Sequence, residues 1–338
     1  MTAHGLTEIE GTSIVSAAQW QAEVVTQCRP VVIRRLVNHW PVVEAAAQSG
    51  GAVRAYLAAF DAGGEIEVFE GGADIAGKYY YNADLTAFNF KRELMKLARA
   101  LDAILLTNDT TDSTLYVGAI PTHDYLPGFA QANPMPFLAP TVSPRLWLGH
   151  ASNVAAHYDT LDNLACVIMG ARRFTLFPPS EIGNLYVGPI DHTMAGQPVS
   201  LAASAAQDNA KFPSFGKALD RMLVAELNTG DALYLPKLWW HKVESTAPIN
   251  GLVNYWWDAF AAGPDSPYTS LLLSMITIAE RPPAERAAWR AFFDHYVFRP
   301  NGHPLAHLPD EKHGLLGPLK HNYGAIRARV MHLLRHIA

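Results

Sequence analysis

Two histidines and an aspartate have the types and the spacing of a metal site. His157 and Asp159 are separated by one residue, so on an extended strand both side chains point to the same face and can reach one ion. His241 lies much further along the chain, between two strand-like apolar runs. Two histidines and one carboxylate on one face of an octahedron leave three positions open, as in non-heme Fe(II) oxygenases. A His-x-Asp pair and a single histidine among aromatic residues also occur in proteins without metal. The residues around them are therefore needed to support a metal site.

The segments around these residues form two motifs. The first runs from Val154 to Pro179 and reads VAAHYDTLDNLACVIMGARRFTLFPP. The second begins at Gly230, reads GDALYLPKLWWHKVES, and is followed by NYWW, which ends at Trp257. In both motifs the candidate ligands adjoin short apolar runs rich in β-branched and aromatic residues, which is typical of strands. Several short strands separated by turn residues predict a sandwich or a barrel.

These motifs resemble those of the JmjC-type cupin-like Fe(II)/2-oxoglutarate dioxygenases, a family that includes the asparaginyl hydroxylase of hypoxia-inducible factor and its bacterial relatives. The resemblance runs from about Leu115 to Trp257, and the segment RPVVIR at Arg29 to Arg34, followed by Trp40 and Pro41, is also similar. It implies a mainly β fold with flanking helices: a double-stranded β-helix (jelly-roll, cupin-like) core that holds Fe(II) and 2-oxoglutarate, plus a C-terminal helical region.

The resemblance also implies a role for each matching residue. His157, Asp159 and His241 fall on the metal ligands. Tyr116 matches a tyrosine whose hydroxyl meets the distal carboxylate of 2-oxoglutarate. The polar positions beside this co-substrate correspond to Asn163 and Asn254.

Two positions depart from the family pattern. The lysine that binds the distal carboxylate is replaced by Arg172, and a threonine three residues before the first ligand is replaced by Val154. Arginine is a competent carboxylate partner that can bind in a bidentate fork, but it is longer than lysine. We therefore expect 2-oxoglutarate, with a repositioned or different 2-oxo acid as an alternative. A solvated turn residue beside Arg173 is the structural alternative for Arg172.

The expected function is that of an Fe(II)- and 2-oxoglutarate-dependent hydroxylase acting on a protein, a peptide or a small molecule. Two other classes stay open: a cupin-like metalloprotein that uses Zn or Mn for a non-oxidative reaction, and a binding protein without catalysis. The sequence selects neither the substrate nor hydroxylation over demethylation. Walls for the pocket are expected from Trp239, Trp240, Trp256 and Trp257, although core packing is the simpler interpretation of each.

Composition is that of a globular protein. The 338 residues are 49% hydrophobic and carry a net charge of −5, so no strong basic field indicates a nucleic-acid partner. The two cysteines, Cys28 and Cys166, lie far apart in sequence and are expected to be reduced in a cytoplasmic protein. No run approaches the roughly 20 apolar residues of a membrane span, and the N-terminus lacks the pattern of a signal peptide.

Three regions are expected along the chain: an N-terminal α/β region at 1–113, the catalytic core at 114–260 and a helical region at 261–338. In the last region, Trp289, Phe292, Phe293, Tyr296 and Val297 recur at helical spacing. Such apolar stripes need cover, and the resemblance favours a homodimer contact through these helices.

Local patterns predict the individual elements. Residues 121–144 are rich in proline without any period and are expected to form a covering loop or a lid over the site. A hairpin is expected about Gly170, and KYYYN at Lys78–Asn82 is either a sheet edge or an aromatic patch facing substrate. Helices are expected at Ala17–Gln27, Val42–Gln48, Ala52–Phe60, Phe90–Leu105 and Tyr268–Ala279, and strands at Val31–Leu36, Glu65–Phe69, Thr114–Ile120, Val224–Leu227, Ala232–Leu235, His241–Glu244 and Gly251–Trp257.

Overall fold

The computed structural model describes residues 5–82, 84–106, 113–190, 193, 196–204, 210–260, 263 and 265–335. By internal contacts the chain divides into two units, 1–259 and 260–338. The sequence also predicts a polar loop at Thr107–Ser113, which lies mostly outside the described residues. Strands from residues 1–113 and from the expected core join one sheet. The boundary expected at residue 113 stays a prediction.

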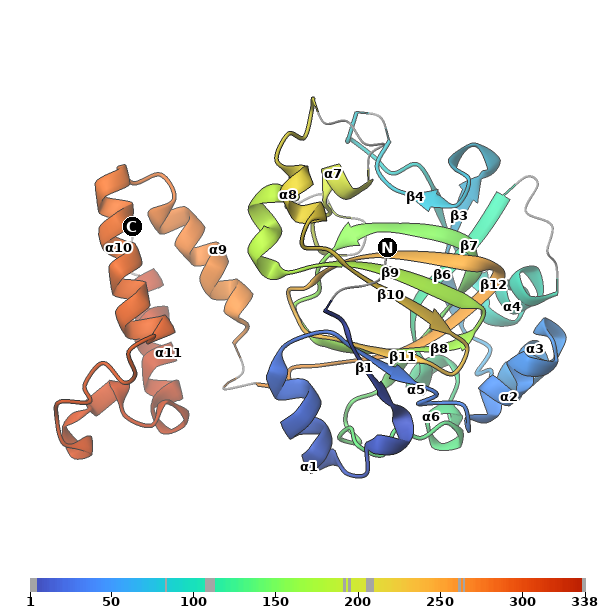
Figure 1. Ribbon diagram of the computed structural model, residues 1–338, viewed down its shortest axis with the longest axis horizontal. Helices are drawn as coiled ribbons and strands as arrows, with labels where there is room; N and C mark the ends of the chain where they lie inside the picture. Colours follow the sequence, from blue (N-terminus) through green and yellow to red (C-terminus); the bar gives the residue numbers. More distant parts are fainter. Residues whose placement is uncertain are drawn as a thin grey trace. The chain divides into compact units, whose positions relative to one another are not determined.

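The first unit is built on a twelve-stranded mixed sheet flanked by helices (Figure 1). This confirms the expected mainly β fold of the cupin type. The path β1-β2-β11-β8-β12-β7-β6-β3-β5 carries nine strands, while β4, β9 and β10 branch from it. The strands are β1 (Thr7–Glu10), β2 (Val31–Arg34), β3 (Glu65–Gly72), β4 (Lys78–Tyr79), β5 (Lys91–Lys96), β6 (Ser113–Pro121), β7 (Pro144–His157), β8 (Asp162–Met169), β9 (Ala171–Phe177), β10 (Leu223–Asn228), β11 (Ala232–Leu235) and β12 (Trp240–Trp257).

Two long strands hold the barrel together. The strands expected at His241–Glu244 and Gly251–Trp257 are one continuous strand, β12, with a register shift between Ser245 and Ile249. Its first half pairs with β9 and its second half with β8, while β7 pairs along both halves. The hairpin expected about Gly170 is therefore wrong. Among the pairings of the described residues, β8 and β9 each pair with β12 and not with each other, so Gly170 is a corner between two layers.

This corner yields a stability prediction. Gly170 has φ +77°, and a Cβ there would lie 2.5 Å from Asn250 Oδ1 and 2.6 Å from the Ile249 carbonyl oxygen. A left-handed conformation alone costs a non-glycine residue about 1–2 kcal/mol. We therefore expect Gly170→Ala to lower the free energy of unfolding by at least about 2 kcal/mol in urea titrations. In Gly183→Ala, the matched control, the new Cβ meets no atom within 4 Å, so the change should stay within about 0.5 kcal/mol.

The helices of the first unit agree with the patterns in most places. Ser16 caps the N-terminal helix, but the helix changes its winding from α (α1, Ala17–Gln19) to π and then 3-10 before Cys28. The expected helix at Phe90–Leu105 is half wrong, since its first part is the edge strand β5. The others are α2 (Pro41–Gln48), α3 (Gly50–Ala58), α4 (Leu97–Leu105), α5 (Thr122–Tyr125), α6 (Phe129–Ala132), α7 (Leu201–Ser204) and α8 (Phe215–Leu219).

The proline-rich segment 121–144 is not a lid. It forms α5 and α6, and its Leu126 and Phe129 are fully buried in the main hydrophobic core. Asn133 joins it to α2 by accepting a hydrogen bond from the Val42 N–H. None of its residues lines the cavity of the candidate site. The absence of a period reflected two very short helices, for which sequence periodicity carries too little information.

A second cluster of buried apolar side chains is separate from this helix-covered core. Leu233 and Leu235 of β11 pack there against side chains from β8, β9 and β10. Both cysteines are free; Cys166 lies buried on β8 and Cys28 is exposed. No helix among the described residues has both the length and the apolar character that crossing a membrane requires.

The second unit is helical and exposes large apolar side chains. Its helices are α9 (Pro267–Ile278), capped by Ser266, α10 (Pro283–Phe293) and α11 (Leu319–Arg335), with a π-helical turn at Asp294–Phe298. Within the described part of this unit, none of the three α-helices has a buried residue.

Candidate metal and co-substrate site

The three expected ligands meet at the end of the barrel. Strand pairing sets His241 of β12 directly opposite His157, the last residue of β7, and Asp159 follows two residues later. One potential ligand atom from each residue lies within 4.8 Å of the other two. The His241 Nε2 is 3.8 Å from Asp159 Oδ2, and the centres of the two imidazole rings are 4.3 Å apart. These distances bring two nitrogens and one carboxylate around a single point.

Backbone carbonyls orient both imidazoles. His157 Nδ1 lies 2.8 Å from the Ala155 carbonyl oxygen, and His241 Nδ1 lies 3.0 Å from that of Trp239. A carbonyl only accepts, so each Nδ1 carries a hydrogen, and Nε2 is the nitrogen of each ring that can offer a lone pair to a metal. Burial and the neighbouring His157 lower the pKa of His241 to about 4, so that its ring is neutral at pH 7.

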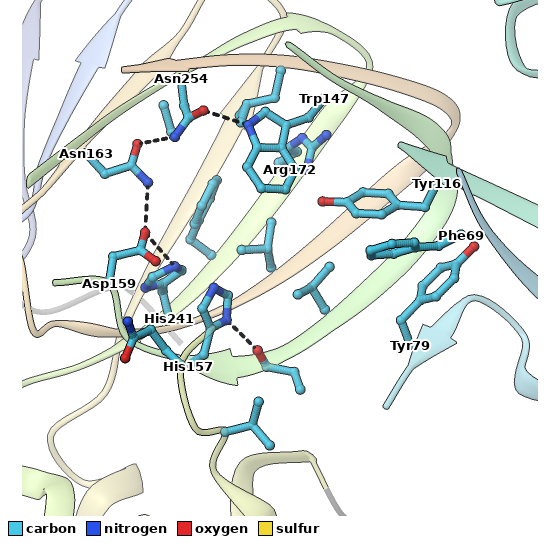
Figure 2. A pocket seen from close by; sticks show the side chains of 18 of the residues that line it. Phe69, Tyr79, Tyr116, Trp147, His157, Asp159, Asn163, Arg172, His241 and Asn254 are labelled. Carbon is cyan, nitrogen blue, oxygen red and sulfur yellow. Dashed lines mark hydrogen bonds and ion pairs between the residues drawn. The ribbon is translucent and has the colours of Figure 1, made fainter. Parts of the chain in front are cut away.

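A chain of hydrogen bonds orients the Asp159 carboxylate (Figure 2). The Trp147 indole donates to Asn254 Oδ1, the Asn254 amide donates to Asn163 Oδ1, and Asn163 reaches Asp159 Oδ2 at 3.4 Å. A second indole, that of Trp256, donates to the same Asp159 oxygen at 3.1 Å. Two donors on Oδ2 fix the orientation of the carboxylate. Asn163 and Asn254 both line the cavity. Asn163 contacts the predicted ligand Asp159 directly, and Asn254 contacts it through Asn163.

The cavity extends from this group of ligands to a buried arginine. Arg172 on β9 is 3% exposed, and its Nε and Nη2 have no hydrogen-bond partner among the described residues. Its charge faces the Tyr116 hydroxyl, and burial raises the pKa of Tyr116 and lowers that of Arg172. Since an uncompensated buried cation is costly, this end of the cavity favours an anion with two oxygens. The solvated-turn alternative for Arg172 is wrong.

Several lining residues were missed by the sequence reasoning. Phe69 stands opposite Tyr116 in the β3–β6 register, and Tyr79 and Phe90 pack against the same group of rings. The alternation along Glu65–Phe69 could have identified Phe69 as a residue outside the main core. Ile66 and Val68 are buried on one face of the strand, so Phe69 points to the opposite face. Of the KYYYN segment only Tyr79 lines the cavity.

The expected tryptophan wall is mostly wrong. Among Trp239, Trp240, Trp256 and Trp257, only Trp256 lines the cavity. Trp240 packs edge-on against Tyr158 in another cluster, and Trp257 lies against Tyr234. Alternation on β12 explains Trp240 and Trp257, which adjoin the lining residues His241 and Trp256 and therefore point to the opposite face. Trp147 of β7 also lines the cavity.

A family model described as a cupin-like domain matches residues 17–263. The chain belongs to this family. Members with JmjC-type domains are often Fe(II)/2-oxoglutarate oxygenases or demethylases. The match covers most of the first unit, including β2 and the helices before the predicted core, so the family domain begins well before the motifs themselves.

Individual relatives resemble a shorter part of the chain. It is 36% identical over 115 residues to a Jumonji C domain-containing protein 5 of Drosophila melanogaster, covering 34% of this chain and 27% of the relative. It is 35% identical over 115 residues to an HSPB1-associated protein 1 homolog of Danio rerio, covering 33% and 24%. A lysine-specific demethylase JMJ31 of Arabidopsis thaliana is 31% identical over 117 residues, covering 33% and 20%. The chain thus matches about a quarter or less of each relative.

Proposed function

We propose that the protein is an Fe(II)- and 2-oxoglutarate-dependent oxygenase, most simply a hydroxylase of a protein, peptide or small molecule. The observation that carries the proposal is the pairing of two features in one cavity. One is a His-Asp-His group in which both Nδ1 atoms bond to backbone carbonyls and the Nε2 atoms are left for a metal, and the other is a buried guanidinium without an anionic partner. Two imidazoles and one carboxylate suit Fe(II), and Arg172 suits the far carboxylate of a 2-oxo diacid.

Different residues would bind the metal, bind the co-substrate and exclude water. His157, Asp159 and His241 would hold the metal, while Arg172 and Tyr116 would bind the distal carboxylate. The hydrogen-bond chain through Asn254 and Asn163 would keep Asp159 in one orientation, and the aromatic side chains would exclude water. When bound, Fe(II) and 2-oxoglutarate with O2 supply an oxidant that hydroxylates a C–H bond, with succinate and CO2 as co-products.

The test is turnover of 2-oxoglutarate to succinate by aerobic enzyme reconstituted with Fe(II), without added substrate. Oxygen-dependent succinate is the expected result, since slow uncoupled turnover needs only the metal and the co-substrate. The Zn or Mn alternative predicts metal binding without oxygen-dependent succinate, and the binding-protein alternative predicts neither. A complete absence of succinate, together with no thermal shift on adding 2-oxoglutarate, would contradict the proposal.

We also propose that two copies of the chain pair through their C-terminal helices. The described residues of this unit expose Ile276 by 82%, Phe292 by 58% and Val297 by 60%. Large apolar side chains exposed on the surface are typical of interaction sites when they gather in one patch. The expected result is a dimer mass in light scattering, reduced to a monomer mass by Ile276→Glu combined with Phe292→Glu. A wild-type monomer at micromolar concentration would contradict the proposal.

Cellular location is a further part of the proposal. Cys28 and Cys166 are both free thiols, and their presence supports a reducing compartment such as the cytoplasm.

A further inference from the structure

Asp162 is a buried carboxylate that joins three parts of the barrel. It opens β8 and is 1% exposed. Its Oδ1 accepts from the Tyr234 hydroxyl at 3.1 Å and from the Lys237 N–H at 3.4 Å. Its Oδ2 accepts from the Ala259 N–H at 3.1 Å and lies 3.3 Å from Lys237 Nζ. Lys237 Nζ also pairs with Asp258, so the ionic contacts tie the end of β11 to the end of β12.

The turn that Asp162 holds is strained. Between β11 and β12 the chain passes through Leu238, which has φ +68° and a side chain that is 47% exposed. A left-handed conformation is unfavourable for a leucine and persists only where neighbouring contacts impose it. Here those contacts are Asp162 on Lys237 and the Asp159 carbonyl, which accepts from the Leu238 N–H at 2.8 Å.

The same turn orients a predicted metal ligand. Its next residue, Trp239, supplies the carbonyl that accepts from His241 Nδ1. The Trp239 indole donates to the Cys28 carbonyl at 3.2 Å, which anchors the far side of the turn. Any shift of residues 236–239 therefore moves the hydrogen bond that sets the His241 ring. The segment bearing His157 and Asp159 is joined to Asp162 by only two intervening residues.

We propose that Asp162 is a positioning residue for the metal centre. Its carboxylate, paired with Lys237, holds the strained turn against the segment that carries His157 and Asp159. It thereby sets where His241 stands relative to the other two ligands. The inference rests on the proposed metal site and adds a residue that lies outside the cavity lining.

Co(II) is the probe that tests this inference, because its absorption spectrum reports ligand geometry independently of turnover. We expect Asp162→Asn, which keeps the shape but removes the charge, to weaken Co(II) binding by about tenfold or more and to change the visible spectrum. Adding Leu238→Gly to this variant relieves the strain of the turn, since glycine adopts positive φ freely. The double variant should recover at least about threefold of the affinity.

Asp231 provides a matched control at the other end of β11. It is likewise buried, pairs with Arg34 at 2.8 Å and accepts from the Arg35 and Asn228 N–H groups. Asp231→Asn should lower thermal stability comparably but leave Co(II) affinity within about twofold of wild type. If Asp162→Asn fails to fold, Lys237→Met removes only the ionic half of the junction and should weaken Co(II) binding by at least about threefold.

Two results would overturn this inference without affecting the proposed function. One is Co(II) binding of wild-type strength in a folded Asp162→Asn or Lys237→Met variant. The other is a loss of Co(II) affinity in Asp231→Asn equal to that in Asp162→Asn. Failure of the wild-type protein to bind Co(II) would overturn the proposed function as well. The two failures are therefore distinguishable by the behaviour of the wild-type chain.

Discussion

Replacing His157 by alanine is expected to abolish Fe(II)-dependent formation of succinate from 2-oxoglutarate. The Nε2 of His157 is one of three donors that converge on a single point, and its ring is held by the Ala155 carbonyl. Loss of a direct ligand should exceed the tenfold to hundredfold effect of removing an outer partner, so we expect metal affinity to fall by at least about a hundredfold. Isothermal titration with Fe(II) under anaerobic conditions, followed by a succinate assay in air, measures both effects.

The matched control for this variant is His123→Ala. His123 is exposed and pairs with Asp124 on α5, away from the cavity lining. The His123→Ala variant should bind Fe(II) and form succinate like the wild type. The comparison distinguishes the loss of a metal ligand from the loss of any one histidine. Metal binding by His157→Ala at wild-type strength would place the metal elsewhere and refute the assigned triad.

Replacing Arg172 by methionine is expected to have opposite effects on the co-substrate and on the fold. Truncating one partner of a buried, hydrogen-bonded charge pair costs about 2 kcal/mol or more, so the Kd of 2-oxoglutarate should rise by at least roughly thirtyfold. Without the ligand, the charge of Arg172 has no carboxylate partner among the described residues. An apolar side chain of similar length should therefore raise the melting temperature of the ligand-free protein.

The neighbouring Arg173 is the natural control, because its side chain is 48% exposed and lies 4.0 Å from Glu226. Arg173→Met should leave both 2-oxoglutarate affinity and stability nearly unchanged. Arg172→Lys tests the departure from the family pattern directly, since a shorter ammonium binds as a point charge rather than a fork. Unaltered 2-oxoglutarate binding in Arg172→Met would show that Arg172 does not bind the distal carboxylate of the co-substrate.

The fold class could be predicted from the sequence because strand and turn signals in the motifs are local. Gly230, for example, has φ +95° just before β11, where the motif placed a turn. The errors occurred where pairing is non-local. Nothing in the residues near Gly170 shows that β8 and β9 both pair with β12, more than sixty residues along the chain. Similarly, Lys91–Lys96 has helix-forming residues but completes a sheet edge against β3, so tertiary pairing overrode local propensity.

By itself, the sequence determined which donor types are present and that His157 and Asp159 can serve one site, because an i, i+2 spacing on extended backbone is a local geometric fact. Only the tertiary structure decided that His241 stands opposite His157, since that depends on the register of β7 and β12. It also decided that Arg172 is buried rather than solvated, because burial is a property of the whole barrel and not of the turn that contains the residue. The residue types in the sequence define which donors the candidate site can use, and the strand register brings those donors together.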